Sequence, residues 1–521
     1  MSRRTTKLLA LVLISAVSAC VVVRTVSIES MTPDAAVGTD VRTPMKVFHT
    51  DGTISVFPSG ARVTTEAVMG MASHYSLDLS TRTPVDSVPL DSIVGIEAFR
   101  GGVAAGATVA FSVLATAGVI LGAVGIACAA DPKCFGSCPT IYTYEDGEEV
   151  LEAEAFSYSI APLLEARDVD RLGARTSPDG RLRLEVRNEA LETHYINHLE
   201  ILEARHARDR RAYPNESGRI VSVGSEVAPL AAVDRDGAER THELMTRDAT
   251  AFASTEARIR AADGEDYWDW IDLTFPRPES DEAALVLRLR NSLLNSVLFY
   301  DLMLGSRGVE ALEWLGSGIN RIGEAVELGR WFNATMGLRV SVMGPDGWEP
   351  VTRVGDTGPI AWKELAVTVP VPEGTGDELH VRLGFLADEW RIDYVGLADD
   401  VARAPVEVLP VASISRIGDS PDDEMRAKLA EPDEDYLVTV AGTALSLEFQ
   451  PSADVPDEER TYFLSSQGYY TEWIRPEWIR TSAATEGFSP SEEVVGHLMD
   501  RWLEEKDEFE RKFFETRIPV R

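Results

Sequence analysis

Short runs of alternating apolar and polar residues, separated by turn motifs, make up most of this chain. Asp-Gly dipeptides occur at 51–52, 146–147, 179–180, 236–237, 263–264 and 346–347. This dipeptide favours tight hairpin turns in which both central residues take a positive φ. Several of the dipeptides lie between β-prone runs, as at 141–151 and 177–186. The pattern therefore predicts a mainly β fold built from antiparallel β-sandwich domains.

Helical periodicity is restricted to two parts of the chain. Between Gly308 and Met336, apolar residues recur three and four positions apart, which is the period of one helix face. Near the C-terminus, Ser489 is followed by Pro490 and Glu492, the order expected at the start of a helix. We therefore predict one mid-chain helix and one C-terminal amphipathic helix.

A hydrophobic, glycine-rich segment without any charged residue runs from Gly101 to Ala130. Its length is sufficient to span a bilayer core, which takes about 20 residues. Small residues spaced four apart, as at Gly102 and Gly106, permit close helix packing. We predict a helix or a broken helical pair here. A transmembrane helix, a re-entrant hairpin and a helix buried within protein remain the alternatives.

The predicted elements divide the chain into consecutive segments. We expect a signal peptide over 1–19, a small N-terminal β domain over 20–100, the hydrophobic segment over 101–130, a β-sandwich domain over 131–305, a helix over 306–336, a second β-sandwich domain over 337–402, a β-rich region with acidic loops over 403–488 and a C-terminal helix over 489–521. A chain of 521 residues is long enough for several such domains.

The first 20 residues have the pattern of a secretory signal. Basic residues at positions 3, 4 and 7 precede a short apolar stretch over 8–17, and small residues follow. The tetrad Val17-Ser18-Ala19-Cys20 resembles the lipobox of bacterial lipoproteins, with an aliphatic residue, two small residues and a cysteine. The resemblance implies that the signal is cleaved before Cys20, that this thiol is lipidated and that the new N-terminus is acylated.

The lipobox resemblance also implies a location. Two or more acyl chains hold a protein stably on a bilayer. Residue 21 is valine and not the aspartate that retains lipoproteins in the inner membrane, so the outer membrane is favoured. The rest of the chain resembles uncharacterised exported lipoproteins, for which no activity is known. A plain signal peptide with a chance cysteine is the alternative.

The remaining cysteines, Cys128, Cys134 and Cys138, lie within eleven residues. In an oxidising envelope compartment we expect a local disulfide that joins Cys138 to Cys134 or Cys128. Free thiols are the alternative. A metal site has little support, because it would need paired C-x2-C motifs or nearby histidines.

Charge and motifs narrow the range of functions. Asp and Glu outnumber Lys and Arg by 85 to 50, which gives a formal net charge of −35 and disfavours nucleic acid as a partner. The start of a zinc-protease motif at His242 and Glu243 has Thr246 in place of the second histidine. Nucleophile-elbow, P-loop and dinucleotide-binding motifs are absent from the sequence. We therefore name no catalytic residue, no metal site and no cofactor.

Two aromatic clusters, at 267–270 and 469–480, contain interleaved acidic and basic residues. Aromatic rings supply contact area and ions supply orientation at a binding face. The candidate face consists of Trp268, Trp270, Tyr469, Tyr470, Trp473 and Trp478. The alternative interpretation is that these rings pack in a sandwich core.

These observations favour a lipid-anchored cell-envelope protein that serves as a non-catalytic binding or scaffold module. It would contact the membrane through its acyl chains, and through residues 101–130 if these enter the bilayer. An envelope protein or a polysaccharide would be its partner. The alternative is a polysaccharide-active hydrolase with a carboxylate pair and an aromatic stacking platform. A deep cleft with facing carboxylates would favour the hydrolase, whereas flat sandwich faces would favour the scaffold.

Overall fold

The computed structural model describes residues 24–103, 138–299, 330–472, 492–515 and 520, with short gaps. The gaps fall at 32, 43–44, 50–52, 58, 76–81, 146, 161–163, 191, 262–265, 375, 434, 441 and 454. The predicted signal peptide, the lipidation site Cys20, residues 104–130 and most of the helix at 306–336 lie outside the described residues. The described structure is mainly β, with several antiparallel sheets and few helices, so the predicted fold class is confirmed.

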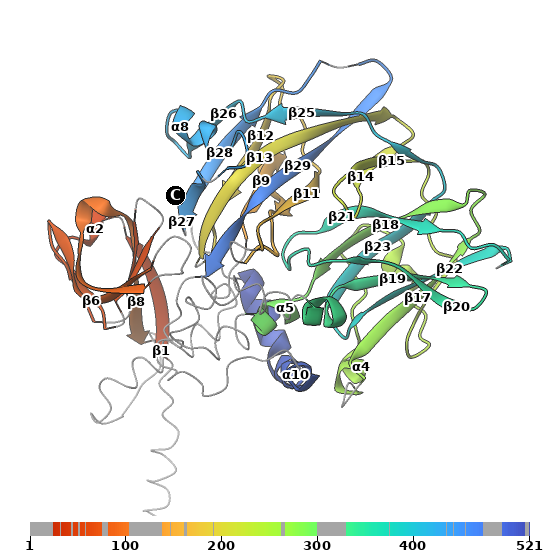
Figure 1. The fold of residues 1–521 in the computed structure, drawn as a ribbon, viewed down its shortest axis with the longest axis horizontal. Helices are drawn as coiled ribbons and strands as arrows, with labels where there is room; N and C mark the ends of the chain where they lie inside the picture. Colours follow the sequence, from red (N-terminus) through yellow and green to blue (C-terminus); the bar gives the residue numbers. More distant parts are fainter. Residues whose placement is uncertain are drawn as a thin grey trace, which may run out of the picture. The chain divides into compact units, whose positions relative to one another are not determined.

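The chain divides into two compact units, and residues 24–103 belong to the first. They form an eight-stranded antiparallel sheet in the order β1-β8-β3-β4-β6-β5-β2, with β7 paired to β6. The sheet curls around a core that includes Val47, Phe57, Val68 and Ile96 (Figure 1). Its elements are β1 (Arg24–Met31), α2 (Pro33–Ala36), β2 (Asp40–Val41), β3 (Met45–His49), β4 (Ile54–Phe57), β5 (Ala61–Val63), β6 (Ala67–Tyr75), β7 (Arg82–Pro89), η1 (Leu90–Ser92) and β8 (Ile93–Val103).

Strand β8 extends into the hydrophobic segment for which we predicted a helix. Its register with β1 runs from Met31 opposite Ile96 to Arg24 opposite Val103. The backbone groups of residues 101–103 are therefore paired in a sheet. The helix prediction was wrong for these three residues, because their partners in β1 lie 75 to 79 residues away and are not visible in the local pattern.

The second unit contains a first β-sandwich built from two five-stranded sheets. One has the order β10-β9-β12-β28-β26, and the other has the order β11-β29-β13-β25, with β27 paired to β13. The strands are β9 (Thr140–Glu145), β10 (Glu148–Glu154), β11 (Ala166–Leu172), β12 (Leu182–Arg187), β13 (Glu192–Ala207), β25 (Val406–Pro410), β26 (Ser413–Arg416), β27 (Leu437–Val440), β28 (Ala444–Phe449) and β29 (Glu458–Glu472). The short helix α8 (Asp423–Ala427) follows β26.

The second β-sandwich lies between β13 and β25 in the sequence. Its sheets have the orders β16-β17-β22-β19-β20 and β21-β18-β23, and residues of both sheets form one core. Its strands are β16 (Ala231–Asp234), β17 (Trp268–Pro276), β18 (Glu282–Asn291), β19 (Leu338–Gly344), β20 (Gly347–Val354), β21 (Lys363–Pro370), β22 (Glu378–Leu386) and β23 (Trp390–Ala398). The helices in this part are η4 (Thr241–Leu244), α4 (Glu256–Ala261) and α5 (Leu294–Ser296), and residues 330–335 are also helical.

A three-stranded sheet joins the two sandwiches. Its strands are β14 (Arg211–Pro214), β15 (Ile220–Val223) and β24 (Val401–Arg403). Ala212 and Ile220 pack with Phe463 of the first sandwich, whereas Tyr213 and Val223 pack in a core with strands β18, β21 and β23 of the second. Apolar packing on both sides of this sheet therefore holds the sandwiches together.

The sheets cross the boundaries between the predicted segments. Strands β17 and β18, from the segment 131–305, share sheets with strands from 337–402. Likewise, β13 pairs with β29 from Glu192 opposite Glu472 to Ala207 opposite Glu458. Asp-Gly turns identify neighbours in sequence, as at Gly147 between β9 and β10, where φ is +85°. Asp-Gly turns therefore do not predict which distant strands, such as β13 and β29, pair with each other.

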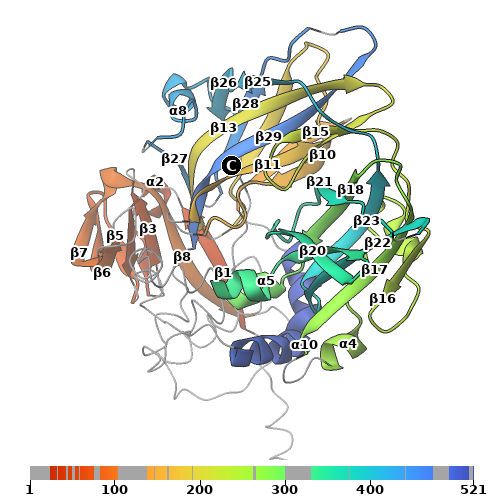
Figure 2. The ribbon, with the colours of Figure 1, turned by 45° about the vertical axis from the view of Figure 1, so that its right-hand side comes forward.

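The C-terminal helix α10 (Glu492–Glu515) packs on the second sandwich and lies beside α4 (Figure 2). Trp502 is fully buried, and its Nε1 donates a hydrogen bond of 2.7 Å to Asp388 Oδ2. Lys506 Nζ lies 2.7 Å from the same oxygen, and Arg391 pairs with Glu510 at 2.6 Å. Among the helices that the structure describes, none is both long enough and apolar enough to cross a membrane.

Candidate functional site

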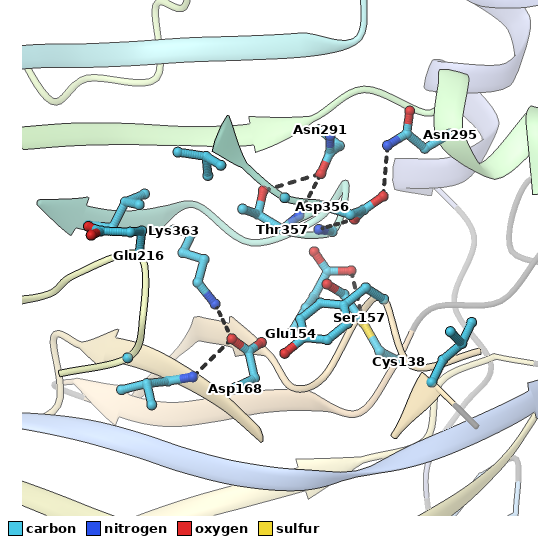
Figure 3. A pocket seen from close by; sticks show the side chains of 18 of the residues that line it. Cys138, Glu154, Ser157, Asp168, Glu216, Asn291, Asn295, Asp356, Thr357 and Lys363 are labelled. Carbon is cyan, nitrogen blue, oxygen red and sulfur yellow. Dashed lines mark hydrogen bonds and ion pairs between the residues drawn. The ribbon is translucent and has the colours of Figure 1, made fainter. Parts of the chain in front are cut away.

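A pocket of about 550 Å³ lies where the two sandwiches of the second unit meet. This volume falls within the usual range of small-molecule sites. In Figure 3, Glu154, Ser157 and Asp168 of the first sandwich lie on one side, and Asn291 and Asp356 of the second lie opposite. Residues 214–218, which connect β14 to β15, complete the wall.

An ion pair crosses the seam between the sandwiches beside this pocket. Asp168 and Asp170 project from the same face of β11, because side chains two residues apart in a strand share a face. Lys363 is the first residue of β21 in the other sandwich. Its Nζ lies 2.6 Å from Asp168 Oδ1 and 2.7 Å from Asp170 Oδ1, and both carboxylates are buried. One ammonium group therefore holds two buried carboxylates.

This group of three side chains carries an excess negative charge when both carboxylates are ionised. Burial raises the pKa of Asp170 to about 7, the neighbouring Asp168 acts in the same direction, and Lys363 opposes them. Burial by itself would lower the pKa of Lys363, but the two carboxylates raise it above its ordinary value. The lysine therefore stays charged, and the raised pKa of Asp170 lets this group of three side chains take up a proton near neutral pH.

Glu154, the last residue of β10, forms a second connection across the seam. Its Oε2 accepts hydrogen bonds from Ile360 N at 2.5 Å and from Ala361 N at 2.7 Å. Gly358 has a φ of +83°, and a Cβ at this position would lie 2.7 Å from Glu154 Oε2. Only glycine fits this turn without displacing the carboxylate.

Cys138 is a free thiol in the wall of this pocket. It is 2% exposed, and its Sγ donates to Glu154 Oε1 at 3.5 Å. Burial raises the pKa of the thiol, and the Glu154 carboxylate raises it further. Our expectation of a disulfide at Cys138 was therefore wrong for this structure: the thiol is directed to a buried carboxylate in the protein interior. Its expected partners Cys134 and Cys128 lie outside the described residues.

The opposite wall is ordered by hydrogen bonds around residues 355–358. Asn295 Nδ2 donates to Asp356 Oδ2 at 2.7 Å, and Gly358 N donates to Asp356 Oδ1 at 2.9 Å. Thr357 N donates to Asn291 Oδ1 at 2.7 Å. Burial raises the pKa of Asp356, although its two hydrogen bonds oppose that shift.

Four buried polar atoms of the pocket wall have no hydrogen-bond partner within the described chain. They are Ser157 Oγ, Asp168 Oδ2, Asn291 Nδ2 and Asn295 Oδ1. Their side chains are 92% buried or more. A buried donor or acceptor without a partner costs about 1–3 kcal/mol. Each of these atoms belongs to a side chain that lines the pocket, so a bound molecule that reached it would supply the missing hydrogen bond.

The pocket also has an apolar side. The Phe299 and Phe332 rings both line it, with centroids 5.3 Å apart. Tyr470 lines it from β29, and its hydroxyl donates to Ser157 O at 2.9 Å. Aromatic rings next to hydrogen-bonding groups are the usual composition of a small-molecule site.

The six aromatic residues of the predicted binding face do not form one face where they are described. Trp268 and Trp270 lie on β17 of the second sandwich, and the Arg339 guanidinium lies 3.7 Å from the Trp268 ring centroid. Tyr469 and Tyr470 lie on β29 of the first sandwich and are buried, and Tyr469 stacks on Tyr195 with centroids 4.5 Å apart. Of these four, Tyr470 alone lines the pocket. Trp473 and Trp478 lie outside the described residues.

The polar residues of the pocket could not be identified from the sequence. Lys363 and Asp168 are 195 residues apart, and each aspartate is one of 85 acidic residues. The scarcity of lysine is a signal that could have identified Lys363. The chain has only seven lysines, and Lys363 begins a mainly apolar strand. In the described part of the chain, no group of three or more His, Cys, Asp and Glu residues is arranged to hold a metal ion.

No protein-family model matches the chain, and comparison with curated proteins also gives no match. Among solved structures, the chain is weakly similar to a GH31 alpha-xylosidase from Xanthomonas citri, with 10% identity over 85% of this chain and a TM-score of 0.15. It is also weakly similar to the arabinofuranosyltransferase AftD from Mycobacteria, with 10% identity over 87% of this chain and a TM-score of 0.13. The chain covers 36% and 32% of these two proteins. Similarities this low carry no argument about fold or function.

Proposed function

We propose that this protein is a lipid-anchored cell-envelope binding module, and that its ligand site is the pocket between the two sandwiches. The observation that carries the proposal is the set of four buried polar atoms without partners in the pocket wall. A polar ligand that bonded to these atoms would offset a cost of about 1–3 kcal/mol for each of them. The hydrogen bonds that these atoms would gain therefore favour ligand binding in this pocket.

The carboxylates of the pocket support binding rather than catalysis. A glycoside hydrolase needs one carboxyl group as acid and another as nucleophile or base, both directed at the substrate. Here Asp168 pairs with Lys363, Glu154 accepts two backbone N–H groups, and Asp356 accepts from Asn295 and Gly358. Each of these three carboxylates already serves an internal contact that holds the pocket wall, and the fourth lining carboxylate, Glu216, belongs to an exposed residue.

One observation favours the hydrolase as a second candidate. Burial raises the pKa of Asp356, and a carboxyl group with a raised pKa is the usual general acid of a glycosidase. Aryl glycosides with a chromogenic leaving group test this alternative. Release of the phenolate that Asp356→Asn abolishes would establish hydrolysis. No release by the unmodified protein would exclude it for these substrates.

The lipid anchor rests on the lipobox resemblance at Cys20. Metabolic labelling with a fatty-acid analogue should mark the protein, and Cys20→Ser should remain unlabelled. Equal labelling of both proteins would contradict the anchor at this residue and would leave the pocket argument unaffected.

The binding function is tested by ligand-observed NMR with a mixed library of sugars, sugar acids, amines and organic phosphates. We expect at least one compound to bind, and Ser157→Ala to weaken its binding. Ser159→Ala is the matched control, because Ser159 Oγ is also buried without a partner in the described chain but does not line the pocket. The proposal fails if no compound binds, or if both variants bind as the unmodified protein does.

A further inference from the structure

The composition of the pocket wall also specifies the chemistry of its ligand. On the basis of the proposed function, we infer that the pocket binds a neutral, hydroxyl-rich ring, that is, a sugar residue, in preference to an anion or a cation. The inference rests on three properties of the wall: its charge balance, its unpartnered hydrogen-bonding atoms and its aromatic rings.

The wall contains four acidic and three basic side chains, so their charges nearly balance. The basic residues already have partners: Lys363 pairs with Asp168 and Asp170, and Arg167 Nε donates to Ser465 Oγ at 2.8 Å. Arg353 donates to Met336 O at 2.8 Å and to Asn333 Oδ1. An anion in the pocket would therefore meet the Glu154, Asp168 and Asp356 carboxylates together with basic groups that already donate to other atoms.

A cationic ligand is disfavoured for the opposite reason. At Asp168 Oδ2, an unpartnered carboxylate oxygen of the buried wall, a cation would lie close to Lys363, because the other oxygen of this carboxylate lies 2.6 Å from the Lys363 ammonium group. A second positive charge at Oδ2 would be repelled by Lys363 at short range, and the buried surroundings would screen that repulsion weakly. A neutral ligand meets neither penalty.

The unpartnered atoms need a ligand that both donates and accepts hydrogen bonds. Asp168 Oδ2 and Asn295 Oδ1 only accept, Asn291 Nδ2 only donates, and Ser157 Oγ does both. A carboxylate or phosphate group only accepts, and an ammonium group only donates. Each hydroxyl group of a sugar does both, so several hydroxyls on one ring can satisfy this mixed set.

The apolar part of the wall suits the rest of such a ring. Phe299, Phe332 and Tyr470 supply aromatic surface in the same pocket. The C–H face of a sugar is apolar and can pack against an aromatic ring while its hydroxyls form hydrogen bonds.

The test uses sets of ligands that share one sugar ring and differ only in charge. Glucose, glucuronate and glucosamine form one set, and galactose, galacturonate and galactosamine form another, all as methyl glycosides. Affinities are measured by NMR titration of the purified protein. We expect a neutral member to bind most tightly, and Ser157→Ala to weaken it by about 3- to 10-fold, the loss of one neutral hydrogen bond. Ser159→Ala should have no effect.

Two outcomes would overturn the inference, and they differ from failure of the proposed function. If a charged member binds most tightly and Ser157→Ala weakens it, the pocket is a binding site but its ligand class is wrong. If no member of either set binds, the sugar inference is wrong, and the broader library decides whether the binding function stands.

Discussion

Lys363 Nζ lies 2.6 Å from Asp168 Oδ1, and this contact joins two β-sandwiches through residues that are 195 positions apart in the sequence. It lies at the wall of the pocket, together with the hydrogen bonds that Glu154 accepts from Ile360 and Ala361. The polar contacts that hold the seam together therefore also shape the candidate site.

Lys363→Met should destabilise the protein strongly. The substitution keeps most of the side-chain volume but leaves Asp168 and Asp170 buried without their cation, which costs about 3–5 kcal/mol. Lys428→Met is the control, because its partner Asp435 is 68% exposed and such pairs contribute about 0–1 kcal/mol. Urea unfolding measures both changes. Equal stability of the two variants would show that the seam does not depend on the lysine.

Asp170 should make stability fall as the pH rises toward 8. Its pKa is about 7 in the folded protein and close to the ordinary aspartate value when unfolded, so the folded state binds more protons between these values. Stability therefore decreases with pH in this interval, by up to about 1.4 kcal/mol per pH unit for one group. Asp170→Asn should flatten the profile of unfolding free energy between pH 5 and 8. If the profile of the variant ran parallel to that of the unmodified protein, it would contradict the raised pKa of Asp170.

Gly358→Ala should cost more stability than Gly418→Ala. Both glycines have a φ near +83°, so either alanine pays about 1–3 kcal/mol for its backbone conformation. A Cβ at Gly418 meets no atom within 4 Å of the described structure, whereas at Gly358 it would contact Glu154. Thermal unfolding of both variants measures the difference. If Gly358→Ala were the milder of the two, Glu154 would not hold the turn as described.

Cys138 should be a free and unreactive thiol in the native protein. It is buried, and its raised pKa keeps the sulfur protonated, so iodoacetamide should modify it only after unfolding. Mass spectrometry of protein purified without reductant compares the modification of Cys138 before and after unfolding. A peptide in which Cys138 is linked to Cys134 or Cys128 would restore the disulfide that the sequence suggested.

The local parts of the fold could be predicted from the sequence. Asp-Gly at 146–147 and at 346–347 marks the hairpins β9–β10 and β19–β20, because a tight turn depends on neighbouring residues. The pairing of β13 with β29 could not be predicted, since it joins residues 192–207 to 458–472. The extension of β8 through Val103 was missed for the same reason.

The candidate site was less predictable than the fold. Tyr470 was identified in the sequence, but as part of a binding face with Trp268 and Trp270, which lie on the other sandwich. The pocket is instead assembled from short segments that the topology brings together. Its chemistry depends on which carboxylates remain without a second partner, as at Asp168 Oδ2, and this follows from packing rather than from residue type.

The central claim, that the pocket between the sandwiches is a ligand site, is tested most directly by a crystal structure of the protein with a compound that binds in solution. We predict electron density for the compound inside the pocket, within hydrogen-bond distance of Ser157 Oγ and Asp168 Oδ2. Density for the compound at another place on the molecule, with the pocket unchanged, would contradict the claim.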